Sequence, residues 1–274
     1  MTFSGMITSP DNTKVKYARS LHKKRVRYRE KRYLIEGLRL VAHALQRGRW
    51  PALVFHTEAF AATERGSSLV QRLVSREDTA VWCVTPRVMK VICDTVTPQG
   101  VVGIVSMQEA SAALAHRATL LLILDSIRDP GNLGTILRTA QATCVEAVVL
   151  SHGCADAYSP KVVRASMGAH FDLPLFHDAT WPTIEKLVIG KHCVLADADG
   201  QLTPWEFDWA PPVALIVGSE AHGASAEARA MAQLSLRLPM AEGAESLNAA
   251  IVAAVMLFEA QRQRRWPSQV PGAD

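Results

Sequence analysis

Short apolar runs, separated by polar, glycine-rich or proline-rich stretches, recur along the second half of the chain. Most of them consist of aliphatic residues without alternating polar positions, which is typical of strands buried on both faces of a parallel sheet. Longer segments with helical periodicity lie between the runs. This order predicts an α/β fold with a mostly parallel sheet. The runs are Leu120–Asp125, Ala147–Ser151, His192–Asp197, Val213–Gly218 and Leu234–Leu238.

Helical and strand patterns also alternate in the amino-terminal part of the chain. An amphipathic helix is predicted over Ile35–Gly48, and strands over Ala52–Thr57, Ala80–Thr85 and Gly100–Met107. The alanine-rich stretch after the last of these strands has a different charge and periodicity, which is typical of a linker. We therefore expect a small α/β domain at 1–107, a linker at 108–118 and a second domain at 119–274.

Polar residues follow the first strand of the second domain in the sequence DPGNLGTILRTA, Asp129–Ala140. A turn at Pro130–Gly131 and a helix from Leu133 would place Asn132 and Arg138 near the carboxyl end of that strand. Ligands of open α/β sheets collect at such strand ends. The alternative is that Asn132 only caps the helix and Arg138 is an ordinary solvated helix residue.

Two later segments repeat this strand-loop-helix arrangement. LIVGSEAHG, Leu215–Gly223, ends in a loop that carries Glu220 between two glycines. LRLPMAEGAESLN, Leu236–Asn248, leads from a short strand through a small-residue loop into a long helix that opens at Ser246. Because parallel strands end at the same edge of a sheet, we expect the three polar loops to lie close together.

Together the three segments resemble the signature motifs of the SpoU/TrmH family of RNA ribose 2′-O-methyltransferases, part of the SPOUT class. The resemblance spans Leu120–Arg265 and implies a trefoil-knotted catalytic domain that binds S-adenosylmethionine and needs no metal. It implies catalytic roles for Asn132, Arg138, Glu220, Ser246 and Asn248, and donor binding by Gly218, Leu238, Met240 and Leu247. The third motif departs from the family at Glu242, where a glycine is usual.

The family's usual proposal makes the arginine at Arg138 the group that activates the 2′-hydroxyl. An arginine is almost always protonated, so it acts as a base only where its pKa is greatly lowered. The alternative is that Arg138 stays cationic, stabilises the developing alkoxide and holds a phosphate. In that case Glu220 and Ser246 would orient Arg138 and the nucleotide.

The positive charge of the chain is concentrated near its amino terminus. Residues 1–50 contain thirteen Lys and Arg against three acids, whereas the remaining residues have a net charge of −6. Tyr17, Tyr28 and Tyr33 are interleaved with this charge, and cations beside aromatic rings are typical of an RNA surface. A solvated basic helix face is the alternative. The candidate RNA-binding residues are Lys14, Lys16, Arg19, Lys23, Lys24, Arg25 and Arg27.

The first domain, with YLIEG at Tyr33–Gly37, resembles the small ribosomal-protein-like RNA-binding domain that precedes many SpoU catalytic domains. This resemblance favours large-subunit ribosomal RNA as substrate, with transfer RNA as the alternative. A non-enzymatic RNA-binding or ribosome-assembly factor on the same fold is a further alternative. The final helix, Ser246–Arg264, is apolar on most of its circumference, so it must be buried on more than one side, and we expect a homodimer interface to supply the second side. A plain core helix is the alternative.

Other functional classes lack their sequence signatures. The chain contains no G-x-x-x-x-G-K-[ST], G-x-G-x-x-G, G-x-S-x-G or H-E-x-x-H motif. Its five cysteines include no C-x-x-C pair, so we expect reduced thiols and no zinc site. No apolar run reaches the length of about 18 residues that a membrane span needs. Because the amino terminus also lacks a signal-peptide pattern, we expect a cytoplasmic protein.

Overall fold

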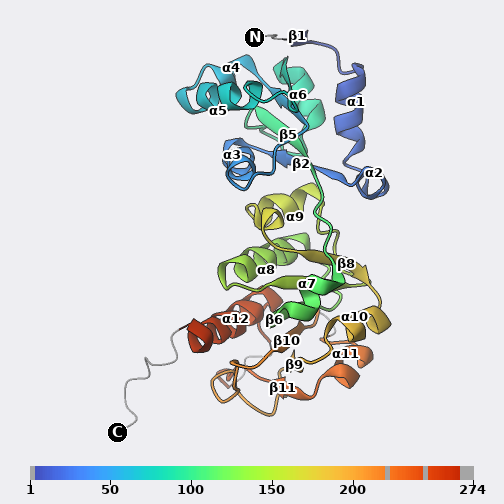
Figure 1. Cartoon of the computed structure of the whole chain (residues 1–274), viewed down its shortest axis with the longest axis vertical. Helices are drawn as coiled ribbons and strands as arrows, with labels where there is room; N and C mark the ends of the chain where they lie inside the picture. Colours follow the sequence, from blue (N-terminus) through green and yellow to red (C-terminus); the bar gives the residue numbers. More distant parts are fainter. Residues whose placement is uncertain (1–3, 220–222, 243–245, 266–274) are drawn as a thin grey trace. The chain divides into compact units, whose positions relative to one another are not determined.

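The computed structural model describes residues 4–219, 223–242 and 246–265. The chain forms two compact units (Figure 1). The N-terminal unit consists of residues 1–107 together with Tyr158–Phe171, and the C-terminal unit consists of Gln108–Ala157 and 172–274. The chain therefore passes from one unit to the other at three points.

The described part of the N-terminal unit contains a mixed five-stranded sheet with the order β1-β4-β3-β5-β2. Its strands are β1 (Ser4–Ile7), β2 (Arg32–Glu36), β3 (Leu53–His56), β4 (Ala80–Val84) and β5 (Val101–Ser106). One face packs against α1 (Thr13–Ser20) and α6 (Pro86–Ile92) in a core that includes Val15, Phe55 and Met89. The remaining helices are α2 (Lys24–Glu30), α3 (Leu38–Gln46), α4 (Glu58–Ala61) and α5 (Glu64–Val74).

The helix predicted over Ile35–Gly48 begins only at Leu38, so the prediction was wrong at its amino-terminal end. Arg32–Glu36 instead forms β2, which pairs antiparallel with β5. Gly37 has φ +96°, which is incompatible with a right-handed helix, and its amide donates to the carbonyl of Val101. The strand β1, which was not predicted, pairs with β4 at the edge of the sheet.

The segment Tyr158–Phe171 packs on the N-terminal unit beside β2. It contains α9 (Pro160–Ala165) and a short 3-10 helix, Ala169–Phe171. The rings of Tyr158 and His170 lie 5.0 and 5.8 Å from the ring of Tyr33, which is buried. Burial raises the pKa of Tyr33 far above its ordinary value. Residues distant in sequence thus complete the core of this unit.

The described part of the C-terminal unit contains a six-stranded sheet with the order β11-β9-β10-β6-β7-β8, in which every pair is parallel. The predicted strands are confirmed to within two residues, but β8 was not predicted because its middle residues are not buried. The strands are β6 (Leu120–Leu124), β7 (Ala147–Ser151), β8 (Leu175–Ala179), β9 (His192–Ala196), β10 (Val213–Val217) and β11 (Leu234–Leu236).

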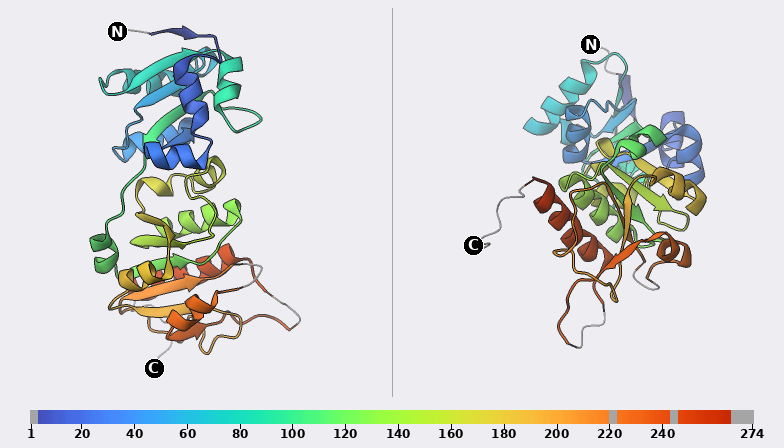
Figure 2. Two further views of the ribbon diagram at one scale, coloured as in Figure 1. Left: turned by 90° about the vertical axis from the view of Figure 1, so that its right-hand side faces the viewer. Right: turned by 60° about the horizontal axis from the view of Figure 1, so that its bottom comes forward.

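Helices cover both faces of this sheet, as Figure 2 shows. On one face α8 (Pro130–Ala142) packs beside α12 (Ala249–Arg265). On the other lie α7 (Ala112–Arg117), α10 (Trp181–Leu187) and α11 (Ala226–Met231), which share a core with alternate strand residues. The stretch expected to be a linker thus contains α7, whose Ala115 is fully buried. No described helix combines the length and apolar character that crossing a membrane requires.

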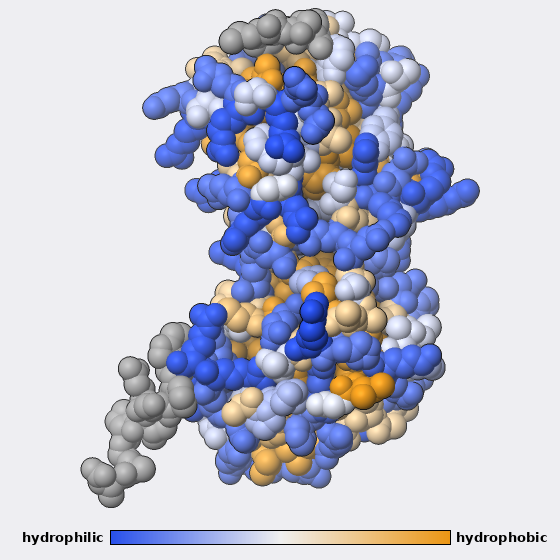
Figure 3. Space-filling view, viewed as in Figure 1, coloured by the Kyte–Doolittle hydropathy of each residue, from blue (hydrophilic) through white to orange (hydrophobic). Residues whose placement is uncertain are grey.

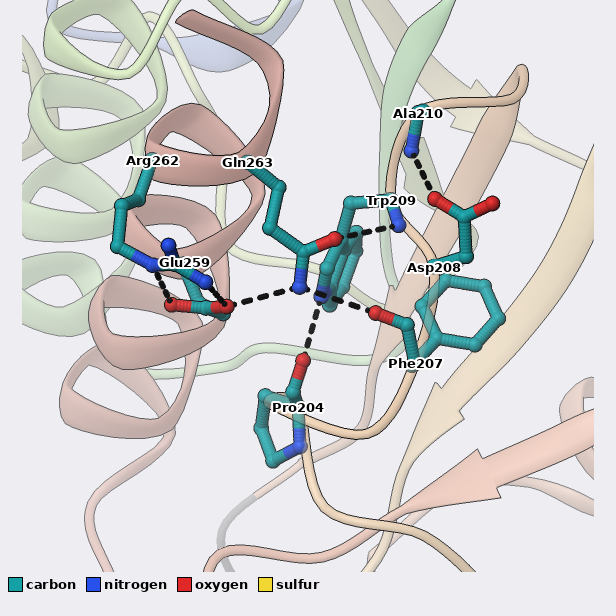
Figure 4. A network of polar contacts seen from close by, with 8 residues as sticks. All are labelled: Pro204, Phe207, Asp208, Trp209, Ala210, Glu259, Arg262 and Gln263. Atoms are coloured by element: carbon teal, nitrogen blue, oxygen red, sulfur yellow. Dashed lines mark hydrogen bonds and ion pairs between the residues drawn. The ribbon is translucent and has the colours of Figure 1, made fainter. Parts of the chain in front are cut away.

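The carboxyl-terminal half of α12 is attached to the loop between β9 and β10 by a network of hydrogen bonds (Figure 4). The Gln263 side chain accepts from the amide of Trp209 at 3.0 Å and donates to the carbonyl of Phe207 at 3.0 Å. Arg262 donates to Glu259 at 2.8 Å and holds the pKa of the Glu259 carboxyl below its usual range. Trp209 is fully buried, so this loop is fixed to the helix.

Candidate active site

Three neighbouring strands of the C-terminal unit end at the same level. In the sheet register Val217 of β10 lies opposite Leu124 of β6 and Ala196 of β9. The residues that follow each strand, among them Asp125, Asp197 and Gly218, therefore lie at one edge of the sheet. This is the edge at which ligands bind in open α/β sheets.

A cavity of about 330 Å³ opens at this edge. Part of its wall is apolar, and the charged side chains in it come from the end of β9 and from α11. Ligand sites commonly combine an apolar wall with a few polar groups in this way. The residues that line the cavity include Asp197, Asp199, Gly218, Ser219, Gly223, Ala224, Arg229, Leu238, Met240, Ser246, Leu247 and Met256.

The loop after β10 folds tightly at Gly218. A Cβ atom at this position would lie 2.5 Å from the amide nitrogen of Ala224 and 2.6 Å from the carbonyl carbon of Gly223. The backbones of Ser219 and Gly223 exchange hydrogen bonds of 2.9 and 3.0 Å. Glycine at 218 is therefore required for the loop to close on itself beside the cavity.

An ion pair that was not predicted lies in the cavity wall. Arg229 of α11 donates to the carboxylate of Asp197, which directly follows β9. The other oxygen of this carboxylate accepts from the amide of Asp199 at 3.1 Å. The available sequence signal was the position of Asp197 at the end of a predicted strand, with Asp199 just beyond it, at the same edge as the three motifs.

The first and third motifs meet through two asparagines. The side-chain amide of Asn248 donates to the side-chain oxygen of Asn132 at 3.0 Å, and Asn248 Oδ1 accepts from the amide of Ala250 at 2.8 Å. Asp129, rather than Asn132, caps α8, because its carboxylate accepts from the amide of Asn132 at 2.8 Å. The Asn132 side chain therefore makes its contact with the third motif instead of acting as the helix cap.

Of the other predicted site residues, some line the cavity and some do not. Gly218, Leu238, Met240, Ser246 and Leu247 all line the cavity. Arg138 is exposed on α8 and is not a lining residue. Glu220 lies outside the described residues.

Most of the candidate RNA-binding residues are exposed on the N-terminal unit. Lys16, Arg19, Lys23, Lys24 and Arg25 are exposed on or beside α1 and α2. Strongly hydrophilic residues cover α2 on the face drawn in Figure 3.

Lys14 and Arg27 have other surroundings. The Lys14 ammonium lies 4.5 Å from the centre of the Trp82 ring. Arg27 is only 3 % exposed, and its guanidinium donates to the carbonyls of Leu21 and His22 at 2.6 and 2.7 Å. We therefore exclude Arg27 from the candidate RNA surface. Tyr33 is also buried and presents no ring for a base to stack on.

Comparison with known families agrees with the two-part organisation of the chain. A sequence model of the SpoU rRNA Methylase family matches residues 119–258, and a model of the MRM3-like substrate binding domain matches residues 12–103. The chain belongs to the SpoU rRNA methylase family. The SpoU match includes the cavity and both asparagines of the first and third motifs.

Relatives of this SpoU family member are similar over nearly its whole length. It is 37 % identical to an uncharacterized tRNA/rRNA methyltransferase of Synechocystis, over 97 % of this chain and 96 % of the relative. It is 33 % identical to the 23S rRNA (guanosine(2553)-2'-O)-methyltransferase RlmP of Bacillus subtilis, over 92 % and 97 % respectively. The structure of an AdoMet-bound rRNA methyltransferase from Sinorhizobium meliloti superimposes with a TM-score of 0.82 at 32 % identity, covering 94 % of this chain and 97 % of the other.

Proposed function

We propose that this chain transfers the methyl group of S-adenosylmethionine to the 2′-oxygen of a ribose in ribosomal RNA. The observation that carries the proposal is the cavity at the strand ends of a SpoU domain, lined by the second and third motifs and adjoined by Asp197 and Arg229. The activity named for RlmP, 2'-O-methylation of 23S rRNA, supports this reaction, and the name of the AdoMet-bound Sinorhizobium enzyme supports methylation of rRNA.

The cavity residues fit the chemistry of the proposed donor. Leu238, Met240, Leu247 and Met256 provide an apolar wall for the adenine ring, while Asp197, Asp199 and Arg229 provide charges of both signs for an amino-acid group. When bound, S-adenosylmethionine supplies an electrophilic methyl group on a cationic sulfur. Gly218 lets the ligand approach the backbone of the second loop closely.

The chain must also align the ribose hydroxyl and remove its proton. Bound S-adenosylmethionine would supply the methyl group, and the proton of the ribose hydroxyl would pass to solvent water as the 2′-oxygen is methylated. We assign to Arg138 the stabilisation of the developing oxyanion by its cation, which requires no deprotonated arginine. Glu220 and Ser246 orient the nucleotide, and the contact between Asn132 and Asn248 holds the first and third loops together.

We propose that α12 forms a homodimer interface. Ile251 and Phe258 are 50 % and 54 % exposed, and their spacing places them along one side of the helix. Large apolar residues exposed together in this way mark a surface that another protein covers. We take a second copy of the chain as the partner, because the apolar pattern around this helix predicts burial on more than one side.

The topology also supports a knot in the C-terminal unit. β11 pairs with β9 on one side, while Leu202 of the loop between β9 and β10 bridges to Leu236 on the other. The same loop then reaches α12 at Trp209 before it returns to β10. We propose that the chain from β11 to α12 passes through this loop, which gives the trefoil knot of the SPOUT class.

A methylation assay tests the proposed reaction. The full chain is incubated with methyl-labelled S-adenosylmethionine and either ribosomal or transfer RNA, and the RNA is then hydrolysed with alkali. Ribose methylation yields labelled, alkali-resistant dinucleotides, and we expect them from ribosomal RNA. Label confined to bases would reject the reaction, and label only in transfer RNA would correct the substrate. A calorimetric titration with the donor tests the non-enzymatic alternative, for which no donor binding is expected.

A further inference from the structure

Asp125 is a buried carboxylate to which the three motifs assign no role. It directly follows β6 and is 2 % exposed, and its amide donates to the carbonyl of Val217 at 2.9 Å. In the part of the chain that the structure describes, no cation forms an ion pair with it. A buried charge without a cation is costly unless several hydrogen-bond donors satisfy it.

The donors that satisfy Asp125 come from three parts of the sheet edge. Its Oδ2 accepts from the amide of Ser225 at 2.7 Å, and its Oδ1 accepts from the hydroxyl of Ser151 at 3.1 Å. The hydroxyl of Ser126 donates to Oδ1 at the longer distance of 3.4 Å. The shortest of these contacts is to Ser225, at the end of the second-motif loop.

The bond to Ser225 fixes a loop that shapes the cavity. Gly218, Ser219, Gly223 and Ala224 line the cavity, and Ser225 follows them directly. The hydrogen bonds between Ser219 and Gly223 close the loop on itself, whereas the bond from Ser225 to Asp125 ties its far end to β6.

We propose that Asp125 is a positioning residue for donor binding, whose carboxylate holds Ser225 and the adjoining Gly223 and Ala224 where they form part of the cavity wall. This inference rests on the proposed function, since it takes S-adenosylmethionine as the ligand. Asp125 acts through the backbone of the loop and does not itself line the cavity.

Substitution of Asp125 in the full chain, with the donor affinity measured by calorimetry, tests the proposal. Asp125→Ala removes the acceptor of the Ser225 amide, and we expect the Kd for S-adenosylmethionine to rise by about ten- to a hundredfold. Asp125→Asn retains an oxygen for that amide. The NH₂ group of the asparagine can donate to the hydroxyl of Ser151. That hydroxyl can in turn donate to the carbonyl of His152, which lies 3.2 Å away. We expect Asp125→Asn to stay within about threefold of the unsubstituted chain, because the bond to the loop is kept.

A matched pair at Ser225 tests the same bond from the loop side. Ser225→Ala and Ser225→Pro both remove the hydroxyl that accepts from Ala228, but only the proline also removes the amide that donates to Asp125. The φ of Ser225, −65°, suits proline. We expect Ser225→Pro to weaken donor binding about tenfold relative to Ser225→Ala. This pair still tests the proposal if Asp125→Ala fails to fold.

Ser151→Ala provides the structural control, since it removes a hydroxyl that hydrogen-bonds to Asp125 but leaves the bond between Asp125 and Ser225. We expect this variant to have a lower Tm and a nearly constant Kd for S-adenosylmethionine. Equal affinity for S-adenosylmethionine in Ser225→Pro and Ser225→Ala would overturn the proposal. It would also be overturned if Asp125→Ala and Ser151→Ala lost this affinity in the same proportion to their loss of Tm. Failure of the unsubstituted chain to bind S-adenosylmethionine would instead reject the proposed function.

Discussion

The side chain of Asn248 donates a hydrogen bond to the side chain of Asn132 across 116 positions of sequence. Asn248 precedes α12 and Asn132 lies in the first turn of α8, two helices that pack side by side. The bond therefore connects the loops of the first and third motifs at the point where each helix begins. Its removal should disturb the reaction more than the fold.

Asn132→Ala should reduce the rate of RNA methylation by about tenfold or more, since a misplaced catalytic group is costly. The Tm should change little, because Asp129 caps α8 through the backbone of residue 132. Steady-state kinetics and thermal unfolding measure the two effects. Thr135→Ala, an exposed change on the same helix, is the control and should affect neither. An unchanged rate in Asn132→Ala would show that the contact has no part in catalysis.

Arg138→Ala should lower kcat by about a hundredfold or more, the usual effect of losing a group that stabilises transition-state charge. The donor Kd should be preserved because Arg138 does not line the cavity. Arg138→Lys should retain part of the activity if the cation, and not a deprotonated guanidine, is what matters. Single-turnover assays and calorimetry separate these effects. Normal turnover in Arg138→Ala would remove the residue from the mechanism.

Arg229→Met should weaken binding of S-adenosylmethionine while barely changing stability. The Arg229 side chain is 54 % exposed, and such ion pairs contribute about 0–1 kcal/mol to folding. In the cavity wall, however, its loss leaves Asp197 without its cation beside the ligand. We expect the donor Kd to rise about tenfold, as one lost charge-assisted contact predicts. An unaltered Kd would mean that the ion pair lies outside the binding surface.

Replacing Lys23, Lys24 and Arg25 together by Ala should reduce RNA affinity and flatten its salt dependence. Each lost phosphate contact lowers the slope of log K against log salt by about 0.7 to 0.9. Filter binding at several salt concentrations measures the slope, and calorimetry should show an unchanged donor Kd. A slope equal to that of the unsubstituted chain would identify the basic cluster as an ordinary solvated surface.

Arg27 belongs to the same basic run as Lys23, Lys24 and Arg25 but is buried, so its replacement should affect stability. Arg27→Met should lower the free energy of unfolding by about 1–3 kcal/mol, because it leaves the buried carbonyls of Leu21 and His22 without their donors. Urea denaturation measures this loss.

Ile251→Asp and Phe258→Asp should each produce a monomer, since a charge in an apolar interface is strongly unfavourable. Sedimentation of the unsubstituted chain should give a dimer. Ala253 is buried within the unit, so Ala253→Asp is unsuitable as a control, whereas the exposed Glu227 on α11 can be changed without effect on association. A monomeric unsubstituted chain would contradict the proposed interface.

The sequence pattern was sufficient for the parallel sheet of the C-terminal unit except for its edge strand β8. Ala147–Ser151 is fully buried and was predicted with its observed bounds. In β8 only Leu175 and Ala179 are buried, so the apolar run that signals a buried strand is missing. The missing apolar run therefore explains why β8 was not predicted.

Contacts between distant parts of the chain could not be read from sequence. Nothing in the basic run distinguishes Arg27, whose guanidinium turns inward, from its exposed neighbours. The ion pair of Asp197 with Arg229 and the packing of Tyr158 on Tyr33 likewise depend on the tertiary arrangement. Five of the residues that the motifs single out line the cavity, but the motifs did not predict Asp197 and Arg229 in its wall or the bond from Ser225 to Asp125.

The position of Tyr158–Phe171 also constrains the order in which the protein can fold during synthesis. Domains generally fold as the chain emerges from the ribosome, amino-terminal part first. Here the residues that pack on β2 and Tyr33 include Tyr158–Phe171, so this packing is incomplete until Phe171 has been synthesised. The rest of the N-terminal unit ends at Met107. The first unit to leave the ribosome therefore cannot be completed until strands β6 and β7 of the second have followed it.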